Sequence, residues 1–297
     1  MLTPGRMKHN QHMQTEVLIA LFRILRIVGI TYLAILIFAR IFESHLLFFP
    51  NLPGRLDGEW RPAGLPVEDV WLRASDGVKL HAWWIPTQGA RFTFLAFHGN
   101  AGNIAMRADV YRFLSQTPAN VLAVEYRGYG RSEGRPSEAG LYSDANDVYK
   151  YLTEVRRVEA KTVISFGQSL GSAVAAHLAA NSGVGGVVLE APFPSLSAVA
   201  RRVFWFLPGV QLMVARQFRT HEQLRRIKVP VLVVHCLRDP VIPPDLEEQV
   251  YDAAEAPKYI LRVKDQCHEE ACLIAPTEYR ASLQTFLAAV TSAASKH

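Results

Sequence analysis

The residues best suited to chemistry centre on Ser169, in the pentapeptide Gly167-Gln168-Ser169-Leu170-Gly171. An apolar run at 162–166 comes directly before it, and an alanine-rich stretch at 172–180 follows. A serine on a tight turn between a strand and a helix projects its hydroxyl above a sheet, and flanking glycines let the backbone bend. The amino end of the helix also presents N–H groups to developing negative charge. We therefore predict that Ser169 is a nucleophile.

A serine nucleophile needs a base, and the base needs a group that orients it. Two apolar, strand-like runs at 229–235 and 259–263 are followed by Asp239 and His268, respectively. We predict that Ser169 attacks a carbonyl, that His268 accepts its proton and later gives it to the leaving group, and that Asp239 holds the imidazole. Asp245 is the reserve candidate for the acid.

The third requirement is a pair of donors for a developing oxyanion. A strand-like run at 92–97 ends in a loop of small residues at 98–103, whose backbone can approach a substrate oxygen. We predict that the backbone N–H groups of Asn100 and Leu170 form the oxyanion hole. His98 opens this loop, and we expect it to act as a structural hydrogen-bonding residue.

The elements that must position these residues alternate between short apolar runs and helical stretches. Runs at 67–73 and 78–85 flank Ser75-Asp76-Gly77, which indicates an antiparallel hairpin. The alternation that follows predicts an α/β fold: a mostly parallel, eight-stranded sheet with helices on both faces. The remaining strands are expected at 92–97, 121–126, 162–166, 186–189, 229–235 and 259–263, and helices near 104–115, 139–155, 170–181, 246–254 and 281–294.

One segment, at about 197–227, interrupts this alternation. It carries the apolar run Val203-Phe204-Trp205-Phe206-Leu207-Pro208 among six arginines. Its place in the chain predicts a small helical cap beside the catalytic face. Such an insertion could form an acyl-binding wall or touch a membrane, because its aromatic residues need an apolar partner. The alternative is an ordinary helical excursion packed on the core.

The amino-terminal region predicts a membrane anchor. Residues 17–42 are apolar apart from Arg23, Arg26, Arg40 and a few small or mildly polar residues, and about 20 helical residues cross a bilayer. Arg23 and Arg26 would have to extend toward one headgroup layer. A helix lying flat on the membrane surface is an alternative. A cleaved signal peptide is another, although no convincing cleavage site follows the run.

The charges around this segment predict its orientation. Arg6, Lys8, Arg23 and Arg26 lie on its amino side, which favours a cytoplasmic amino terminus. The predicted organisation is therefore a cytoplasmic tail at 1–16, a single transmembrane signal anchor at 17–42 and a catalytic domain at 43–297. In a bacterium the domain would lie in the periplasm.

Composition narrows the function classes. A hydrophobic fraction of 49% excludes a disordered chain, and the net charge of +5 comes without a nucleic-acid-binding motif, so no nucleic-acid partner is expected. The three cysteines lack zinc-ligand spacing, and we expect no metal and no cofactor. Cys236 and Cys267 both fall on loops of the catalytic face, where they could pair in an oxidising compartment. Whether Cys267, beside His268, has a redox role stays open.

Four segments together resemble the α/β-hydrolase superfamily, and within it the membrane-anchored branch of depalmitoylases and lysophospholipases that is often labelled serine aminopeptidase-like. They are LLFFP (46–50), FHGNAGNI (97–104), EYRGYGRSEG (125–134) and GQSLG (167–171). The chain order of serine, aspartate and histidine is also that of the superfamily. Glu125 departs from the aspartate that relatives commonly have, but it lies outside the predicted triad.

The resemblance implies a serine hydrolase that acts on esters or thioesters of apolar acyl groups, with a small-molecule or lipid-like substrate and membrane lipid as its surroundings. A peptidase or amidase on the same fold is an alternative. Haloalkane dehalogenation is disfavoured because it needs a carboxylate where Ser169 stands. Acyltransferase or cofactor-free haloperoxidase chemistry stays open. An idle, membrane-anchored binding module is the alternative outside the enzymes, because a fold alone does not imply catalysis.

Overall fold

A computed structural model describes residues 4–50, 52, 61–255 and 257–295; the first three residues of the predicted tail and most of the 51–60 segment lie outside the described residues. Eight strands form one sheet in the order β1-β2-β4-β3-β5-β6-β7-β8. The predicted eight-stranded, mostly parallel sheet is confirmed. The strands are β1 (Glu68–Arg73), β2 (Lys79–Ile85), β3 (Phe92–Phe97), β4 (Ala119–Val124), β5 (Val163–Gln168), β6 (Gly186–Glu190), β7 (Val231–Cys236) and β8 (Lys258–Val263).

The strand directions divide the sheet in two. The hairpin β1–β2 is antiparallel, and β2 also runs antiparallel to β4. From β4 through to β8 every neighbouring pair is parallel. The carboxyl ends of β3, β5, β6, β7 and β8 therefore meet at one edge, where ligands bind in open α/β sheets.

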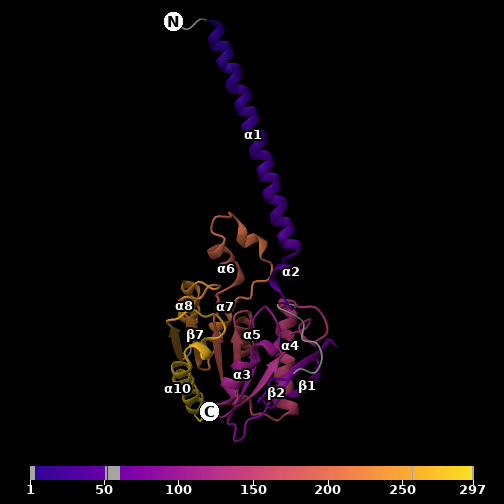
Figure 1. Cartoon of the computed structure of the whole chain (residues 1–297), viewed down its shortest axis with the longest axis vertical. Coiled ribbons are helices and arrows are strands. Elements are labelled where there is room, and N and C mark those ends of the chain that lie inside the picture. Colours follow the sequence, from indigo (N-terminus) through magenta and orange to yellow (C-terminus); the bar gives the residue numbers. More distant parts are fainter. Residues whose placement is uncertain (1–3, 51, 53–60, 256, 296–297) are drawn as a thin grey trace.

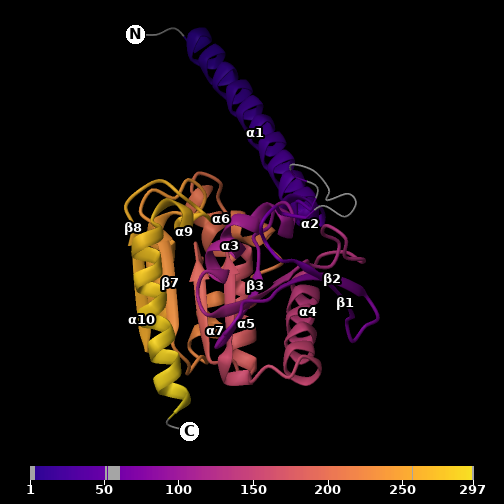
Figure 2. The ribbon, with the colours of Figure 1, turned by 60° about the horizontal axis from the view of Figure 1, so that its bottom comes forward.

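Helices cover both faces of the sheet, so its central strands are buried on both sides (Figure 2). One hydrophobic core joins a face of the sheet to α4 (Glu138–Lys150), α5 (Leu170–Asn181) and α8 (Pro244–Ala253). The second joins the other face to α3 (Ala108–Ser115) and α10 (Pro276–Ala294). The short elements between them are η1 (Ile104–Arg107), η2 (Tyr151–Val155), η3 (Ala160–Thr162) and α9 (Ala271–Ile274).

Most element boundaries differ from the predicted ones by only a few residues, and local chemistry explains the larger shifts. The strand expected at 121–126 ends at Val124, because its parallel neighbour β3 ends opposite this residue, at Phe97. The last helix begins at Pro276 rather than at residue 281, since proline is favoured in the first helical turn.

The predicted cap lies between β6 and β7. It consists of α6 (Leu196–Val203), η4 (Val210–Met213) and α7 (Thr220–Leu224), joined by irregular segments. Glu138, at the start of α4, accepts hydrogen bonds from the backbone N–H groups of Gln217 (2.9 Å) and Phe218 (2.7 Å). The end of the cap is thereby fixed to the main domain.

The amino-terminal helix α1 (Pro4–Ile41) projects away from the domain as a single long helix (Figure 1). Met13–Ile41 within it is long and apolar enough to cross a membrane, and the most hydrophobic part of it has no buried residues. Large apolar side chains exposed along a helix indicate a missing apolar partner. A short second helix, α2 (Glu43–Leu47), connects α1 to the domain.

Candidate active site

Ser169 occupies the sharp turn between β5 and α5. Its backbone has φ 49° and ψ −117°, a conformation that costs a non-glycine residue ~1–3 kcal/mol and must be held by its surroundings. The Ser169 N–H donates to the carbonyl of Glu190 on β6 (2.9 Å), and the Ser172 hydroxyl donates to the Ser169 carbonyl (2.6 Å). These bonds fix the turn, so the serine is held at the carboxyl edge of the sheet.

The glycines on either side of Ser169 are required by close backbone approaches. A Cβ at Gly167 would lie 2.1 Å from the carbonyl oxygen of Gly171. A Cβ at Gly171 would lie 2.1 Å from the carbonyl oxygen of Phe97, at the end of β3. Side chains at these positions would push α5 away from β3 and β5, so the Gly-x-Ser-x-Gly pattern reflects tight packing.

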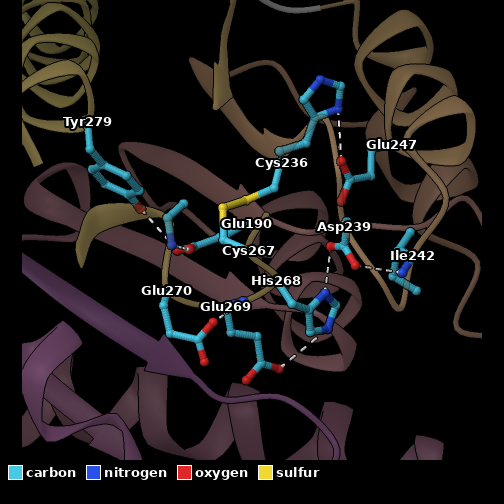
Figure 3. The surroundings of a disulfide bond; sticks show 12 residues. Glu190, Cys236, Asp239, Ile242, Glu247, Cys267, His268, Glu269, Glu270 and Tyr279 are labelled. Carbon is cyan, nitrogen blue, oxygen red and sulfur yellow. Dashed lines mark hydrogen bonds and ion pairs between the residues drawn. A yellow bond between two sulfur atoms is a disulfide. The ribbon is translucent and has the colours of Figure 1, made fainter. Parts of the chain in front are cut away.

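Asp239 and His268 are brought together by the loops that follow β7 and β8. The Nδ1 atom of His268 lies 2.6 Å from Oδ2 of Asp239 (Figure 3). The other oxygen of Asp239 accepts the backbone N–H groups of Val241 (2.7 Å) and Ile242 (2.9 Å). The carboxylate is thus fully engaged and buried, and its orientation fixes the imidazole with Nε2 facing away from Asp239.

The loop that carries His268 is also tied to the turn that carries Ser169. Gln168, directly before Ser169, donates through Nε2 to the carbonyl of Glu269, directly after His268, at 2.5 Å. Among the described residues, Ser169 Oγ and His268 Nε2 form no hydrogen bond, and Nε2 lies 4.0 Å from Oε1 of Glu269. Catalytic hydrogen bonds are often long without substrate and tighten in the reacting complex.

A pocket of about 350 Å³ opens at Ser169 and contains both residues predicted for the oxyanion hole. Asn100 and Leu170 line it next to Ser169. The Asn100 side chain donates to the carbonyl of Leu47 (3.0 Å) and its own carbonyl accepts from Phe49, so the loop is fixed. Within the described part of the chain, the N–H groups of Asn100 and Leu170 donate to no protein acceptor, which leaves them available to a ligand oxygen.

The rest of the pocket wall is almost entirely apolar, and three parts of the chain supply it. The cap and the loop after Asp239 contribute most of the residues, while the anchor helix and α2 contribute the others. A pocket lined in this way suits an acyl chain better than a polar group. The lining residues are Ala39, Glu43, Leu46, Leu47, Phe193, Leu196, Val199, Ala200, Phe204, Val210, Met213, Val214, Val241 and Ile242.

Glu190 is a site residue that the sequence reasoning missed. It is fully buried at the end of β6 and accepts hydrogen bonds from the Ala271 N–H (2.9 Å), the Tyr279 hydroxyl (3.2 Å) and the Gln168 amide (3.3 Å). Burial raises the pKa of Glu190 to about 8, despite these three donors. Its position at a strand end, beside the strand that precedes Ser169, was the available signal.

Glu247 is a second buried acid that the sequence reasoning missed. Its Oε2 lies 2.9 Å from Nδ1 of His235, and both side chains are buried. Glu247 lies beside Asp239 (Figure 3). The pKa of Glu247 is raised to about 10, mainly by burial and secondly by the negative charge of Asp239. Burial lowers the pKa of His235. Glu247 is therefore protonated at neutral pH, and it adds no second negative charge beside Asp239.

A disulfide joins Cys236, at the end of β7, to Cys267, directly before His268 (Figure 3). Their Cα atoms are 5.5 Å apart, within the range of ordinary disulfides. The pairing that the sequence left open is therefore present. The bond links the two strand ends that carry Asp239 and His268, while Cys272 is free and buried.

Two other residues considered in the sequence lie outside the Asp239–His268 contact. His98 is buried, with Nδ1 2.8 Å from the Gly99 carbonyl and Nε2 3.1 Å from Oε1 of Glu125, as expected of a structural residue. Asp245 lies in the first turn of α8, where it is exposed and pairs with Arg202 at 3.0 Å. The reserve acid is thus not the partner of His268.

Comparisons with known proteins agree with this architecture. A family model described as the alpha/beta hydrolase fold matches residues 93–228, which include Ser169. The alpha/beta hydrolase domain-containing protein WAV2 of Arabidopsis thaliana is 36% identical over 236 residues, which are 72% of this chain and 76% of that protein. This chain belongs to the α/β-hydrolase family. Protein bem46 of Schizosaccharomyces pombe is 29% identical over 86% of this chain and 90% of its own length.

Solved structures of other α/β-hydrolases share the fold. The Pyrococcus furiosus esterase Pf2001 superposes with a TM-score of 0.66 at 23% identity, over 81% of this chain and 97% of its own. Acetyl xylan esterase 1 from Thermoanaerobacterium superposes with a TM-score of 0.60 at 21% identity, over 78% and 86% of the two chains. At these identities the likeness concerns the fold. This chain is thus a hydrolase by family, with an apolar pocket at the position of Ser169.

Proposed function

We propose that this protein is a membrane-anchored serine hydrolase that cleaves carboxylic ester or thioester bonds of apolar acyl substrates. The observation that carries the proposal is the position of Ser169: it lies on a strained turn at the wall of an apolar pocket, while the loops after β7 and β8 hold an Asp239–His268 pair. A binding module would need an apolar pocket, but not a serine held in an unfavourable backbone conformation.

In the proposed reaction, the Ser169 hydroxyl attacks the acyl carbonyl and His268 accepts its proton through Nε2. The contact between Nδ1 of His268 and Asp239 keeps the imidazole in the tautomer that leaves Nε2 free, and stabilises the imidazolium that forms. His268 then gives the proton to the leaving alcohol or thiol. In the second half of the reaction His268 takes a proton from water, the water oxygen attacks the acyl carbon, and the bond to Ser169 breaks as His268 returns the proton to the serine oxygen.

The developing oxyanion would be bound by the free backbone N–H groups of Asn100 and Leu170, which flank Ser169 in the pocket. Removing one such donor typically lowers kcat by roughly 10²–10³-fold. Leu170 also begins α5, so the positive end of the helix dipole favours charge at this position. The groups required for acyl transfer are thus all supplied by the chain itself.

Anchoring by α1 follows from its exposed apolar surface. Residues 17–42 would cross the bilayer once, with residues 1–16 on the cytoplasmic side and the domain at 43–297 on the other. The basic residues Arg23 and Arg26 toward the amino side support this orientation. In a bacterial inner membrane the hydrolase domain would face the periplasm, where the Cys236–Cys267 disulfide is stable.

The direct test is turnover of p-nitrophenyl esters of increasing acyl length, with matched thioesters and anilides, by the detergent-solubilised full chain. We expect ester and thioester turnover that rises with chain length until the pocket is filled, and far slower anilide turnover. Ser169→Ala should abolish turnover, whereas Ser182→Ala, at the other end of the same helix, should not. A folded wild-type protein that hydrolyses none of these compounds would support the binding-module alternative, and preferential anilide turnover would support an amidase.

A further inference from the structure

The cap ends in an exposed aromatic cluster that its own domain does not cover. Phe204, Trp205 and Phe206 follow the last turn of α6, and Trp205 is 78% exposed. Leu212, in η4, is 74% exposed. The Trp205 and Phe206 rings contact each other at 6.0 Å between centroids. We call residues 203–208 together with Leu212 the cap tip. Such a cluster on a soluble surface normally marks an interaction site.

The cap tip is attached to the anchor helix rather than to the sheet. The Tyr32 hydroxyl, in the domain-side third of α1, donates to the carbonyl of Pro208 at 2.5 Å. Further down, Glu43 of α2 accepts the N–H groups of Ala215 (2.9 Å) and Arg216 (2.8 Å), where the chain leaves η4. These bonds place the cap along the end of α1, from the junction at Glu43 up to Tyr32. Figure 1 shows the cap, labelled at α6, beside the domain end of α1.

The contact with Tyr32 fixes the depth of the cap tip if α1 spans a membrane. The hydrocarbon core requires about 20 helical residues. Every 20-residue window within Met13–Ile41 includes Tyr32. Arg23 can reach the headgroups only if the membrane-spanning part begins near residue 22. At a rise of 1.5 Å per residue, Tyr32 then lies roughly 14 Å from the domain-side end of the helix. Pro208, bonded to Tyr32, must then lie at or within the boundary of the hydrocarbon.

We propose that the cap tip inserts into the domain-side leaflet of the lipid bilayer, with Trp205 and Phe206 among the acyl chains, and that the pocket takes its substrate from this leaflet. The proposal rests on the anchoring and the hydrolase activity proposed above. Lipid is the partner that fits this surface, because the exposed apolar residues continue the apolar surface of the candidate span.

Two features of the surroundings fit a bilayer. Arg201 and Arg202 lie one turn before the aromatic residues, at the end of α6, and both are exposed. Exposed arginines beside an inserted segment can contact the phosphates of the headgroup layer. The pocket wall also includes Phe204 of the cap tip and Ala39 of α1, so the cavity extends from Ser169 to the surface that would face the lipid. An acyl chain can therefore reach Ser169 without leaving an apolar environment.

The test measures tryptophan quenching by lipid in the full chain reconstituted in phosphatidylcholine–phosphatidylglycerol vesicles, with phosphatidylcholine brominated in the acyl chains as the quencher. We expect quenching in the wild type and loss of most of its amplitude in Trp205→Phe. Trp71→Phe is the matched control: Trp71 is the other described tryptophan with substantial exposure (39%) and lies on β1, so its removal should leave the quenching intact.

A second measurement compares substrates. Trp205→Glu should lower turnover of a long-chain ester embedded in the vesicles several-fold, and leave turnover of a dissolved short-chain ester unchanged, because Trp205 does not line the pocket. Val155→Glu, a change at an exposed residue before β5 begins, should affect neither. Fluorophosphonate labelling of Ser169 in the same vesicles reports on the hydrolase separately.

Lipid quenching that Trp205→Phe leaves unchanged, or equal turnover of the embedded ester by Trp205→Glu and the wild type, would overturn the insertion of the cap tip. If labelling persists in that case, the proposed hydrolase stands and only the membrane contact fails. If labelling and soluble-ester turnover are both absent from the folded wild type, the hydrolase proposal fails, while the quenching result still decides whether the cap tip meets lipid.

Discussion

At the scale of single residues, the site combines a strained serine with carboxylates whose charge is controlled by burial. Asp239 keeps three hydrogen-bonding partners, two of them backbone N–H groups that fix the direction of its side chain. Glu247, beside it, is kept protonated by burial and by the charge of Asp239. Asp239 is thus the carboxylate in contact with Nδ1 of His268, where it can stabilise an imidazolium formed during catalysis.

Replacing Asp239 with asparagine tests the proposed role of this charge. Asparagine keeps the size of the side chain but favours the wrong tautomer of His268, so we expect kcat for a short-chain ester to fall by roughly 10³–10⁴-fold. The matched control is Asp245→Asn, at the exposed acid that pairs with Arg202, which should keep near wild-type kcat. Equal losses in the two variants would contradict the assignment of Asp239.

Glu190 predicts a pH dependence of stability. In the folded protein the pKa of Glu190 is raised to about 8 from an ordinary value near 4.5. Between these two pH values Glu190 therefore keeps its proton in the folded protein but has lost it in the unfolded chain. Its contribution to stability is thus fully present below pH ~4.5 and declines as pH rises toward about 8. In urea unfolding, Glu190→Gln should reduce this decline in the free energy of unfolding, while Glu255→Gln, at an exposed residue, should not. An unchanged slope in Glu190→Gln would show that Glu190 is ionised when buried.

The residues of the site differ in how well the sequence predicts them. Ser169, Asp239 and His268 each follow an apolar strand, so their meeting at one sheet edge could be expected from the order of elements. Glu190 and Glu247 could not be identified in the same way, because their burial depends on which helices and loops cover them. The bond between Gln168 and the His268 loop likewise depends on a side-chain contact across 101 residues of sequence.

At the scale of elements, the loops after β7 and β8 are the parts that must keep their relative positions. The Cys236–Cys267 disulfide and the Asp239–His268 contact both join these two loops. The sequence suggested the pairing but not the state of the thiols, because that state depends on the compartment. For the cap, the sequence predicted the position in the chain. It did not predict the attachment to α1 through Tyr32 and to α2 through Glu43.

Removing the disulfide should weaken the fold measurably. Its two cysteines are 31 residues apart, and a cross-link closing a loop of this size stabilises a protein by ~3–4 kcal/mol in the chain-entropy description. We expect the Cys236→Ser, Cys267→Ser double variant to lose about this much free energy of unfolding in urea, and to lose turnover as the His268 loop loosens. Dithiothreitol should reproduce the effect in the wild type and add nothing in the double variant. A wild type insensitive to dithiothreitol, with no free-energy difference from the double variant, would show that the cysteines are not paired in solution.

At the scale of the whole molecule, α1 and the domain are not independent. The anchor contributes Ala39 to the pocket and forms a hydrogen bond to the cap. The catalytic edge of the sheet therefore lies on the side of the domain that would face the membrane. The α/β fold and its eight strands could be predicted from alternating apolar runs. The involvement of the anchor in the pocket could not, because hydropathy identifies a span but not what it contacts.

Membrane anchoring is tested by alkaline carbonate extraction of membranes from expressing cells. We expect the wild type to remain in the pellet with its amino-terminal segment uncleaved. Two charges in the span, Val28→Glu with Leu33→Glu, should each cost about 2.5–3.5 kcal/mol at the membrane centre and shift the protein to the supernatant. Val155→Glu, on the domain surface, should stay in the pellet. Full release of the wild type by carbonate would favour the surface helix, and a mature chain lacking the segment would favour a cleaved signal peptide.

The role of Ser169 as the nucleophile is tested by labelling the protein with a fluorophosphonate probe. The detergent-solubilised full chain is treated with the probe, digested and mapped by peptide mass spectrometry, in parallel with Ser169→Ala. We predict a single covalent adduct on Ser169 that is absent from Ser169→Ala, since only an activated serine attacks the phosphorus. A folded wild-type protein that carries no adduct, or that carries it on another residue and keeps it in Ser169→Ala, would contradict this role.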